Sequence, residues 1–203
     1  MRNLTEKTGI LSLSCHSSLS QDSDRRSAKP SITMLDKKVS SLINDQINAE
    51  FYSAYLYLDM SNYFEQRGLN GFANWYKIQA QEERDHAMLF YQYLQNNNAA
   101  VTLKAIAKPD KVFKKDMDVL KSGLEHEELV TSLINNIYAA AQKINDFRTM
   151  QVLDWFVKEQ GEEETNANDL ITKYELFGDD PKGLYMLNQE LAGRVYSAPS
   201  LVL

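Results

Sequence analysis

Four stretches of this chain carry apolar residues at helical spacing, and metal-binding types of side chain interrupt each stripe near its middle. Residues three or four positions apart share one helix face, so the interrupting side chains point where the apolar ones point. The apolar positions are Ile43, Ile47, Ala54 and Tyr57, then Phe72, Tyr76, Phe90 and Tyr93, then Leu120, Leu124, Thr131, Ile134 and Tyr138, and finally Leu153, Phe156, Ala167, Leu170 and Tyr174. The interrupting positions are Glu50 in the first stripe, Gln79, Glu83 and His86 in the second, Glu127 in the third, and Gln160 and Glu163 in the fourth. The pattern predicts four amphipathic helices whose shared core contains carboxylates.

Carboxylates in such a core need a positively charged partner. A lone ionised carboxylate in an apolar core costs several kcal/mol unless it is paired. No Lys or Arg falls at the same level on the four stripes. The stripes therefore predict that a metal cation binds between the helices, and redox chemistry of that metal is the expected function.

Composition narrows the class of protein. Of 203 residues, 43% are hydrophobic, while only 8 are glycine and 4 are proline, which favours long helices. The net charge of −6 argues against a nucleic-acid partner. No apolar run approaches the roughly 18 residues that cross a bilayer, so no membrane partner is expected. A single cysteine, Cys15, supplies neither an internal disulfide nor a thiolate cluster. We expect a soluble, cytoplasmic protein.

Three segments differ in character. Residues 1–33 are rich in serine, contain several basic residues and lack periodicity, so they are expected to be disordered. They are interpreted either as an upstream extension or as a targeting leader, and a leader would place the protein in an organelle. Residues 34–194 form the predicted functional domain, and residues 195–203 form a flexible tail.

Helix start and stop signals divide the central domain. Asn70 is expected to cap the second helix, and Asp180 followed by Pro181 predicts the start of a short fifth helix. The expected helices span residues 36–65, 70–94, 117–143, 147–178 and 181–191. The long connection over residues 99–116 is explained by a crossover along the bundle, which lets the second and third helices run parallel. The predicted fold is therefore an all-α four-helix bundle with a long crossover and a short C-terminal fifth helix.

The ligand types indicate which metals fit. Glu83 and His86 form a Glu-x-x-His pair on one helix face, so the second helix contributes two ligands. Carboxylates with one imidazole select hard or borderline ions, and the lack of thiolates disfavours structural zinc. Glu83 is best placed to bridge two ions. Such a pair of ions suits the stepwise oxidation of Fe²⁺ by dioxygen.

These residues carry a family resemblance. The segments NAEFYSAYLY, QEERDH, HEELVT and KEQGEEE together make residues 34–194 resemble prokaryotic-type non-haem ferritins, in the ferritin-like di-iron superfamily. The resemblance implies a first iron site of Glu50, Glu83 and His86, and a second of Glu83, Glu127 and Glu163 with Gln160 beside them. It also implies a third iron site of Glu82, Glu159 and Glu162, and a tyrosine, Tyr57, near the iron pair. Tyr57 is alternatively a plain core aromatic.

Neighbouring families fit less well. Bacterioferritins have a second Glu-x-x-His motif where this chain has Gln160 and Glu163. Their haem-ligand methionine corresponds to Arg84 here, so haem is not expected. His126 lies off the third stripe and is interpreted as a solvated histidine, with a metal or assembly-surface role as the alternative.

The resemblance implies an iron storage protein with ferroxidase activity that assembles as a homo-oligomeric cage of twenty-four subunits. Iron, and dioxygen or peroxide, would be its substrates. Two alternatives stay open from the residues alone. One is a di-iron oxidase or peroxidase of the same superfamily that stores no mineral. The other is a non-catalytic helical interaction protein whose buried acids pair with Lys or Arg.

Overall fold

The computed structural model describes residues 34–203, and the extension or leader predicted over residues 1–33 lies outside them. The described residues form five helices and no strands. These are α1 (Lys37–Gln66), α2 (Asn70–Asn96), α3 (Asp116–Lys143), α4 (Phe147–Phe177) and α5 (Pro181–Ala192). The predicted all-α class is confirmed, and each predicted helix matches an observed one to within two residues at either end.

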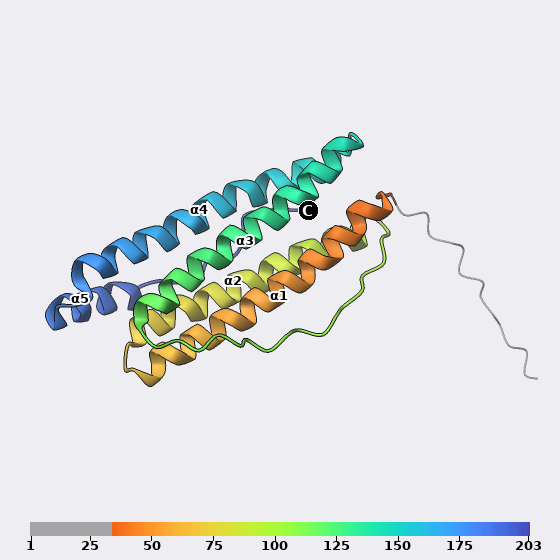
Figure 1. The fold of residues 1–203 in the computed structure, drawn as a ribbon. Coiled ribbons are helices and arrows are strands. Elements are labelled where there is room, and N and C mark those ends of the chain that lie inside the picture. Colours follow the sequence, from red (N-terminus) through yellow and green to blue (C-terminus); the bar gives the residue numbers. More distant parts are fainter. Residues whose placement is uncertain (1–33) are drawn as a thin grey trace, which may run out of the picture. The chain divides into compact units, whose positions relative to one another are not determined.

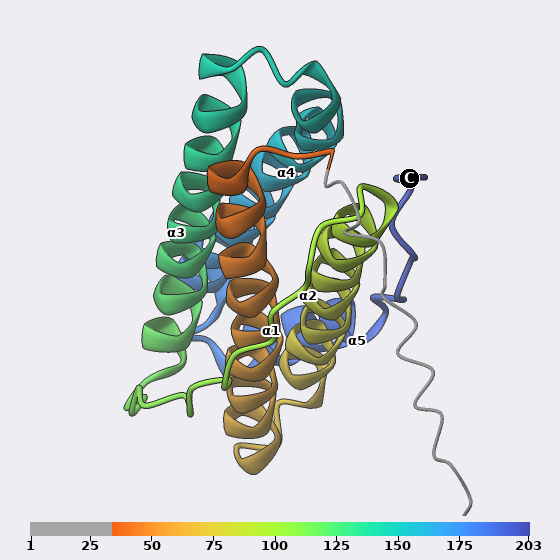
Figure 2. The same cartoon turned by 90° about the vertical axis from the view of Figure 1, so that its right-hand side faces the viewer.

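Two helical hairpins and a crossover build the bundle (Figures 1 and 2). The turn between α1 and α2 contains Gly68, whose φ of +71° suits glycine. The segment between α2 and α3 runs along the length of α1, so α2 and α3 are parallel, as the sequence predicted. It is held there by Asn44, which donates from Nδ2 to the Ala100 carbonyl (3.0 Å) and accepts from the Thr102 amide (2.7 Å).

Side chains satisfy the free amides at most helix starts. Asp36, Asp146 and Asp180 accept hydrogen bonds from the first-turn amides of α1, α4 and α5. The prediction that Asn70 caps α2 is wrong, because Asn70 is the first helical residue and the cap position is Leu69. The Oδ1 atom of Asn188, on α5, instead accepts from the amides of Gly71 (2.8 Å) and Phe72 (3.3 Å). A tertiary contact therefore replaces the local cap.

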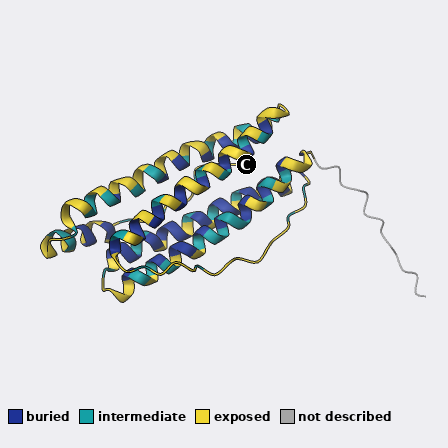
Figure 3. Cartoon of the chain, viewed as in Figure 1, coloured by how far each residue is buried: buried dark blue, intermediate teal, exposed yellow. Residues whose placement is uncertain are grey.

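Buried residues follow the inward faces of the helices (Figure 3). The apolar ones form two clusters that occupy different stretches of the four long helices. One cluster contains Ile47, Phe90, Val130 and Phe156, among others. The other contains Leu56, Ala80, Leu120 and Leu170, among others. On every one of the four long helices, the predicted ligands lie in sequence between a residue of one cluster and a residue of the other. The predicted stripes thus face the core, although Ala54, Leu124, Thr131, Tyr138, Ala167 and Tyr174 are only partly buried.

The C-terminal segment returns along the bundle. Trp155 donates from Nε1 to the Ser200 hydroxyl (3.0 Å), and Leu201 packs against the first apolar cluster. The Tyr196 hydroxyl donates to Asp85 on α2. The prediction of a flexible tail did not anticipate these contacts, and its flexibility stays a prediction.

α5 approaches α2 closely at Gly71. A Cβ atom at Gly71 would lie 1.7 Å from the Asn188 carbonyl oxygen, whereas a Cβ at Gly161 would meet nothing within 4 Å. We expect Gly71→Ala to push α5 away and lower the free energy of unfolding by about 3 kcal/mol. Gly161→Ala, the matched control, should raise it by up to about 1 kcal/mol because alanine favours the helix. Urea unfolding followed by circular dichroism measures both, and equal effects of the two variants would contradict the close approach.

Candidate metal centre

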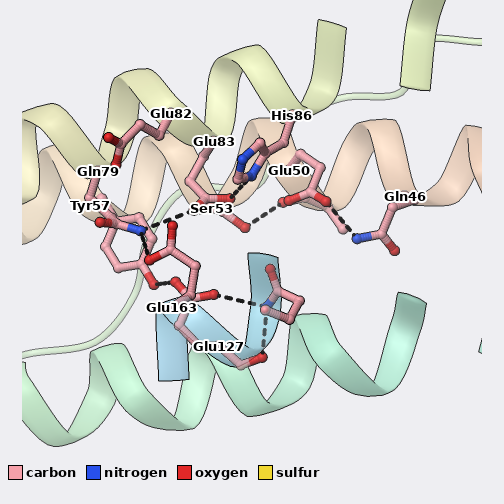
Figure 4. A network of polar contacts seen from close by, with 12 residues as sticks. Gln46, Glu50, Ser53, Tyr57, Gln79, Glu82, Glu83, His86, Glu127 and Glu163 are labelled. Atoms are coloured by element: carbon pink, nitrogen blue, oxygen red, sulfur yellow. Dashed lines mark hydrogen bonds and ion pairs between the residues drawn. The ribbon is translucent and has the colours of Figure 1, made fainter. Parts of the chain in front are cut away.

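Four helices bring the predicted ligands to one level of the bundle (Figure 4). Side chains from α1, α2, α3 and α4 meet there, between the two apolar clusters. The six buried side chains of this group, which we call the central cluster, are Glu50, Glu83, His86, Glu127, Gln160 and Glu163. All six predicted ligands of the di-iron site are thus brought together, while their role as ligands remains a prediction.

Glu50, Glu83 and His86 form one half of the central cluster. Each offers a ligand atom, and these atoms all lie within 4.8 Å of one another. His86 Nδ1 is 3.6 Å from Glu83 Oε2. Gln46 donates to Glu50 Oε1 (2.8 Å), but Glu50 Oε2 has no hydrogen-bond partner among residues 34–203 although it is fully buried. A buried oxygen without a donor suits a bound cation, so this half fits a metal ion.

Glu127 belongs to the other half of the central cluster. It accepts hydrogen bonds from one side chain of α1 and one of α4. The Tyr57 hydroxyl donates to Glu127 Oε1, and Gln160 Nε2 donates to Glu127 Oε2 (3.2 Å). Tyr57 is fully buried and also packs edge-on against His126. The structure therefore places Tyr57 in contact with the cluster, and its role as a functional tyrosine stays a prediction.

Glu163 and Glu83 share one donor, Gln79 on α2. Its Nε2 atom lies 2.7 Å from Glu163 Oε2 and 3.4 Å from Glu83 Oε1. Glu83 is thus close to His86 and Glu50 on one side and to Glu163 on the other. This position between the halves is the one that a bridging carboxylate would need.

Burial and mutual repulsion raise the pKa values of these carboxyls. Burial, reinforced by the charge of Glu83, raises the pKa of Glu50 to about 8. Burial and the charge of Glu127 raise the pKa of Glu163 to about 8. The pKa of Glu127 rises only to about 6, because hydrogen bonds from Tyr57 and Gln160 oppose the effect of burial. The carboxyls of the central cluster therefore need either bound protons or bound cations to offset their charge.

Small ligands have room beside the cluster. A cavity of about 20 Å³ is lined by Tyr57, Gln79, Glu127 and Glu163, together with other residues. That is enough for one water-sized molecule. The arrangement can therefore hold cations between acids and admit a small molecule next to them.

The three residues of the predicted third iron site are arranged differently. Glu82 is ion-paired with Arg194 (Nη2 to Oε2, 2.6 Å), and Glu162 is exposed and paired with Lys158 (3.2 Å). Burial raises the pKa of Glu82 and of Glu159, and the neighbouring acids add to both shifts. The three acids influence one another electrostatically. Glu82, however, already has the guanidinium of Arg194 as its positively charged partner.

Sequence reasoning was wrong about one residue at this level. His126 is 7% exposed, and its Nε2 lies 2.8 Å from the Ser53 hydroxyl, so it is not solvated. Burial, with a contribution from Lys111, lowers its pKa to about 4. The off-stripe position hid this contact, because a wide helix face can bury residues beside the main stripe. Arg194 was also missed as a partner of Glu82, since no local pattern connects them.

The helical domain matches a known protein family. Residues 40–177 match the ferritin-like domain. This chain belongs to the ferritin family. Among its ferritin relatives, a bacterial non-heme ferritin of Staphylococcus haemolyticus is 37% identical over 163 residues, covering 80% of this chain and 98% of the relative. A probable bacterial non-heme ferritin-like protein of Haemophilus influenzae is 35% identical over 158 residues, covering 78% and 96%.

Solved ferritin structures agree with the fold. An open-pore ferritin from the hyperthermophilic archaeon Archaeoglobus fulgidus is 39% identical, with a TM-score of 0.77 over 79% of this chain and 98% of that chain. A form of that ferritin engineered to be closed superposes with a TM-score of 0.78. The resemblance inferred from the sequence and the ferritin-like bundle are therefore confirmed.

Proposed function

We propose that this protein stores iron and is a ferroxidase, oxidising Fe²⁺ with dioxygen at the central cluster and retaining the ferric product in a hollow oligomeric cage. The observation that carries the proposal is the convergence of four buried carboxylates and one imidazole from four helices. None of these carboxylates has a Lys or Arg partner among residues 34–203. The names of the ferritin relatives support iron as the cation.

Glu50, Glu83 and His86 would bind one Fe²⁺, and Glu83, Glu127 and Glu163 would bind the other. Gln160 would stay beside Glu127 as a hydrogen-bond donor. The raised pKa values mean that binding iron releases protons from the acids. Two Fe²⁺ would each give up one electron, and the two electrons with two protons would convert dioxygen to hydrogen peroxide.

Other residues would support this step without binding iron. The hydrogen bond from the Tyr57 hydroxyl would hold Glu127 in its orientation, and this is the role we propose for Tyr57. Phe156 and Trp155 pack edge-on against the His86 ring and shield it. The apolar clusters on both sides exclude bulk water, which strengthens electrostatic interactions at the cluster.

Assembly follows from the family and is part of the proposal. The solved relatives are ferritins described with open or closed pores, which supports a cage, and we propose twenty-four copies of this chain. No helix within residues 34–203 is long and apolar enough to cross a membrane. The cytoplasm is the proposed compartment, unless residues 1–33 act as a leader.

Iron retention tests the proposed function. Metal-free protein is mixed with Fe²⁺ in air and then separated by size-exclusion chromatography with iron staining. Storage predicts a large particle that keeps hundreds of irons, with Glu83→Gln as the control that oxidises slowly. About two irons per chain would instead favour the di-iron oxidase. A melting temperature that Fe²⁺ and Zn²⁺ leave unchanged would favour a non-catalytic interaction protein.

The proposed third iron site gives a separate prediction. We expect the double variant Glu159→Gln, Glu162→Gln to change the number of Fe²⁺ oxidised per dioxygen, because the proposed third iron site would then be lost. The first, fast oxidation should keep its rate, since neither residue belongs to the central cluster. Oxygen-electrode measurements with stepwise Fe²⁺ additions check this. An unchanged ratio would remove Glu159 and Glu162 from the mechanism.

A further inference from the structure

Arg194 follows α5 and closes over one side of α2. Its guanidinium carbon lies 4.1 Å above the Trp75 ring, and Nη2 donates to Glu82 Oε2 (2.6 Å). Nη1 donates to Gln79 Oε1 (2.9 Å). The Arg194 side chain is only 17% exposed, so stacking, ion pairing and hydrogen bonding hold it in a single position.

Gln79 connects Arg194 to the central cluster. An amide side chain accepts at one end and donates at the other, whereas a guanidinium only donates. With Oε1 facing Arg194, the Nε2 of Gln79 must face the opposite way, toward Glu163 (2.7 Å) and Glu83 (3.4 Å). A flipped amide would place its NH₂ group against the guanidinium and its oxygen against carboxylates. Arg194 therefore determines which end of Gln79 the carboxylates meet.

We propose that Arg194 is a positioning residue for the candidate metal centre, acting through Gln79 on Glu163 and Glu83. This inference rests on the proposed function, because it takes the two carboxylates to be metal ligands. Hydrogen bonds behind the ligands orient them, and their loss weakens metal binding by about 10- to 100-fold in other sites. The C-terminal segment thus contributes to a site built on the four helices of the bundle.

The ion pair between Glu82 and Arg194 would make the positioning of Gln79 sensitive to cations bound at Glu82. Because Glu82 anchors the guanidinium, a cation bound by Glu82 would compete with Arg194 and loosen its hold on Gln79. Occupation of the outer acids would then weaken the orientation of Glu163 and Glu83, and the coupling would be reciprocal. The ion pair is the physical link between the two proposed sites.

A structural alternative assigns Arg194 only to fastening the C-terminal segment on Trp75. A double-mutant cycle separates the two roles, because residues that act through one another have non-additive effects. The cycle consists of the wild type, Arg194→Gln, Gln79→Met and the double variant, all as the full chain. Calorimetric titration of metal-free protein with Zn²⁺ gives the affinity of each. Lys173→Gln, which removes the exposed ion pair to Glu190, is the matched control.

We expect Arg194→Gln to weaken Zn²⁺ binding about tenfold and Gln79→Met to weaken it at least as much. Arg194→Gln should have no further effect in the Gln79→Met background. Arg194→Lys should recover part of the loss, and Lys173→Gln should bind like the wild type. Circular dichroism establishes that each variant is folded, and Arg194→Lys takes the place of Arg194→Gln in the cycle if the latter does not fold.

Wild-type affinity in folded Arg194→Gln, or effects that simply add in the cycle, would overturn the positioning role. Weaker Zn²⁺ binding by Lys173→Gln would also overturn it, because removing a positive charge far from the cluster would then be enough to lower the affinity. A wild-type protein that binds no Zn²⁺ would instead refute the metal centre, and with it this inference. The two failures are therefore distinguishable.

Discussion

Replacing Glu83 with alanine is expected to abolish the fast phase of Fe²⁺ oxidation, slowing it by at least about 100-fold. Glu83 lies between the two halves of the central cluster, so its loss removes a ligand from both proposed iron positions at once. Assembly should persist, because Glu83 is inside the helix bundle and a smaller side chain there leaves the surface unchanged. Rapid mixing of metal-free protein with Fe²⁺ in air, followed in the ultraviolet, measures the rate.

Two further variants sharpen this experiment. Glu83→Gln keeps the shape but not the charge, and the same slow rate is expected because a neutral amide does not bridge two cations. Glu128→Ala removes an exposed acid of α3, next to Glu127 in sequence, and should oxidise at the wild-type rate. An undiminished fast phase in Glu83→Ala would eliminate Glu83 as the bridge.

The metal-free protein should lose stability as pH rises from 5.5 to 8. In the folded protein the pKa values of Glu50 and Glu163 are raised to about 8, against an ordinary value of 4.5. Between these values the folded state holds protons that the unfolded chain has released, so the free energy of unfolding falls with pH. One such proton over this range corresponds to about 3 kcal/mol. Below pH 4.5 the acids are neutral in both states, and above 8 the loss is complete.

Zn²⁺ should oppose this trend and make the loss of stability smaller, since cations replace the protons and bind best when the acids are ionised. At a concentration of 100 times Kd, the added stability at pH 8 is about 2.7 kcal/mol. Urea unfolding at pH 5.5 and 8, with Zn²⁺ and with a chelator, measures both the loss of stability with pH and the stabilisation by Zn²⁺. Glu50→Gln should flatten the metal-free pH dependence, whereas Glu128→Gln should not. Stability that rises with pH in the chelated protein would contradict the buried acids.

Local patterns accounted for the helices and for the residues of the central cluster. Asp180 followed by Pro181 starts α5 as predicted, because a cap and a first-turn proline act within one turn. The cap of α2 could not be predicted in this way. Asn70 has the right side chain in the right place, yet Asn188, more than a hundred residues later, supplies the hydrogen bonds. Non-local partners leave no periodic signal.

Contacts between distant parts of the chain were also not predictable around the central cluster. Helical spacing put Glu50, Glu83 and Glu127 on buried faces, and the structure has them there. It did not place His126 against Ser53, because that contact depends on how closely α1 and α3 pack. It gave no indication that Arg194 would reach Glu82, because the C-terminal segment has no regular period.

The sequence by itself determined which faces of the four long helices are buried and which acids lie on them, since a period of 3.6 residues relates spacing to direction. Only the tertiary structure decided which of those acids meet, which oxygen of Glu50 lacks a donor, and which way the Gln79 amide points. These features depend on distances between separate helices and on the path of the chain after α5. Such distances arise from packing, which no single helix encodes.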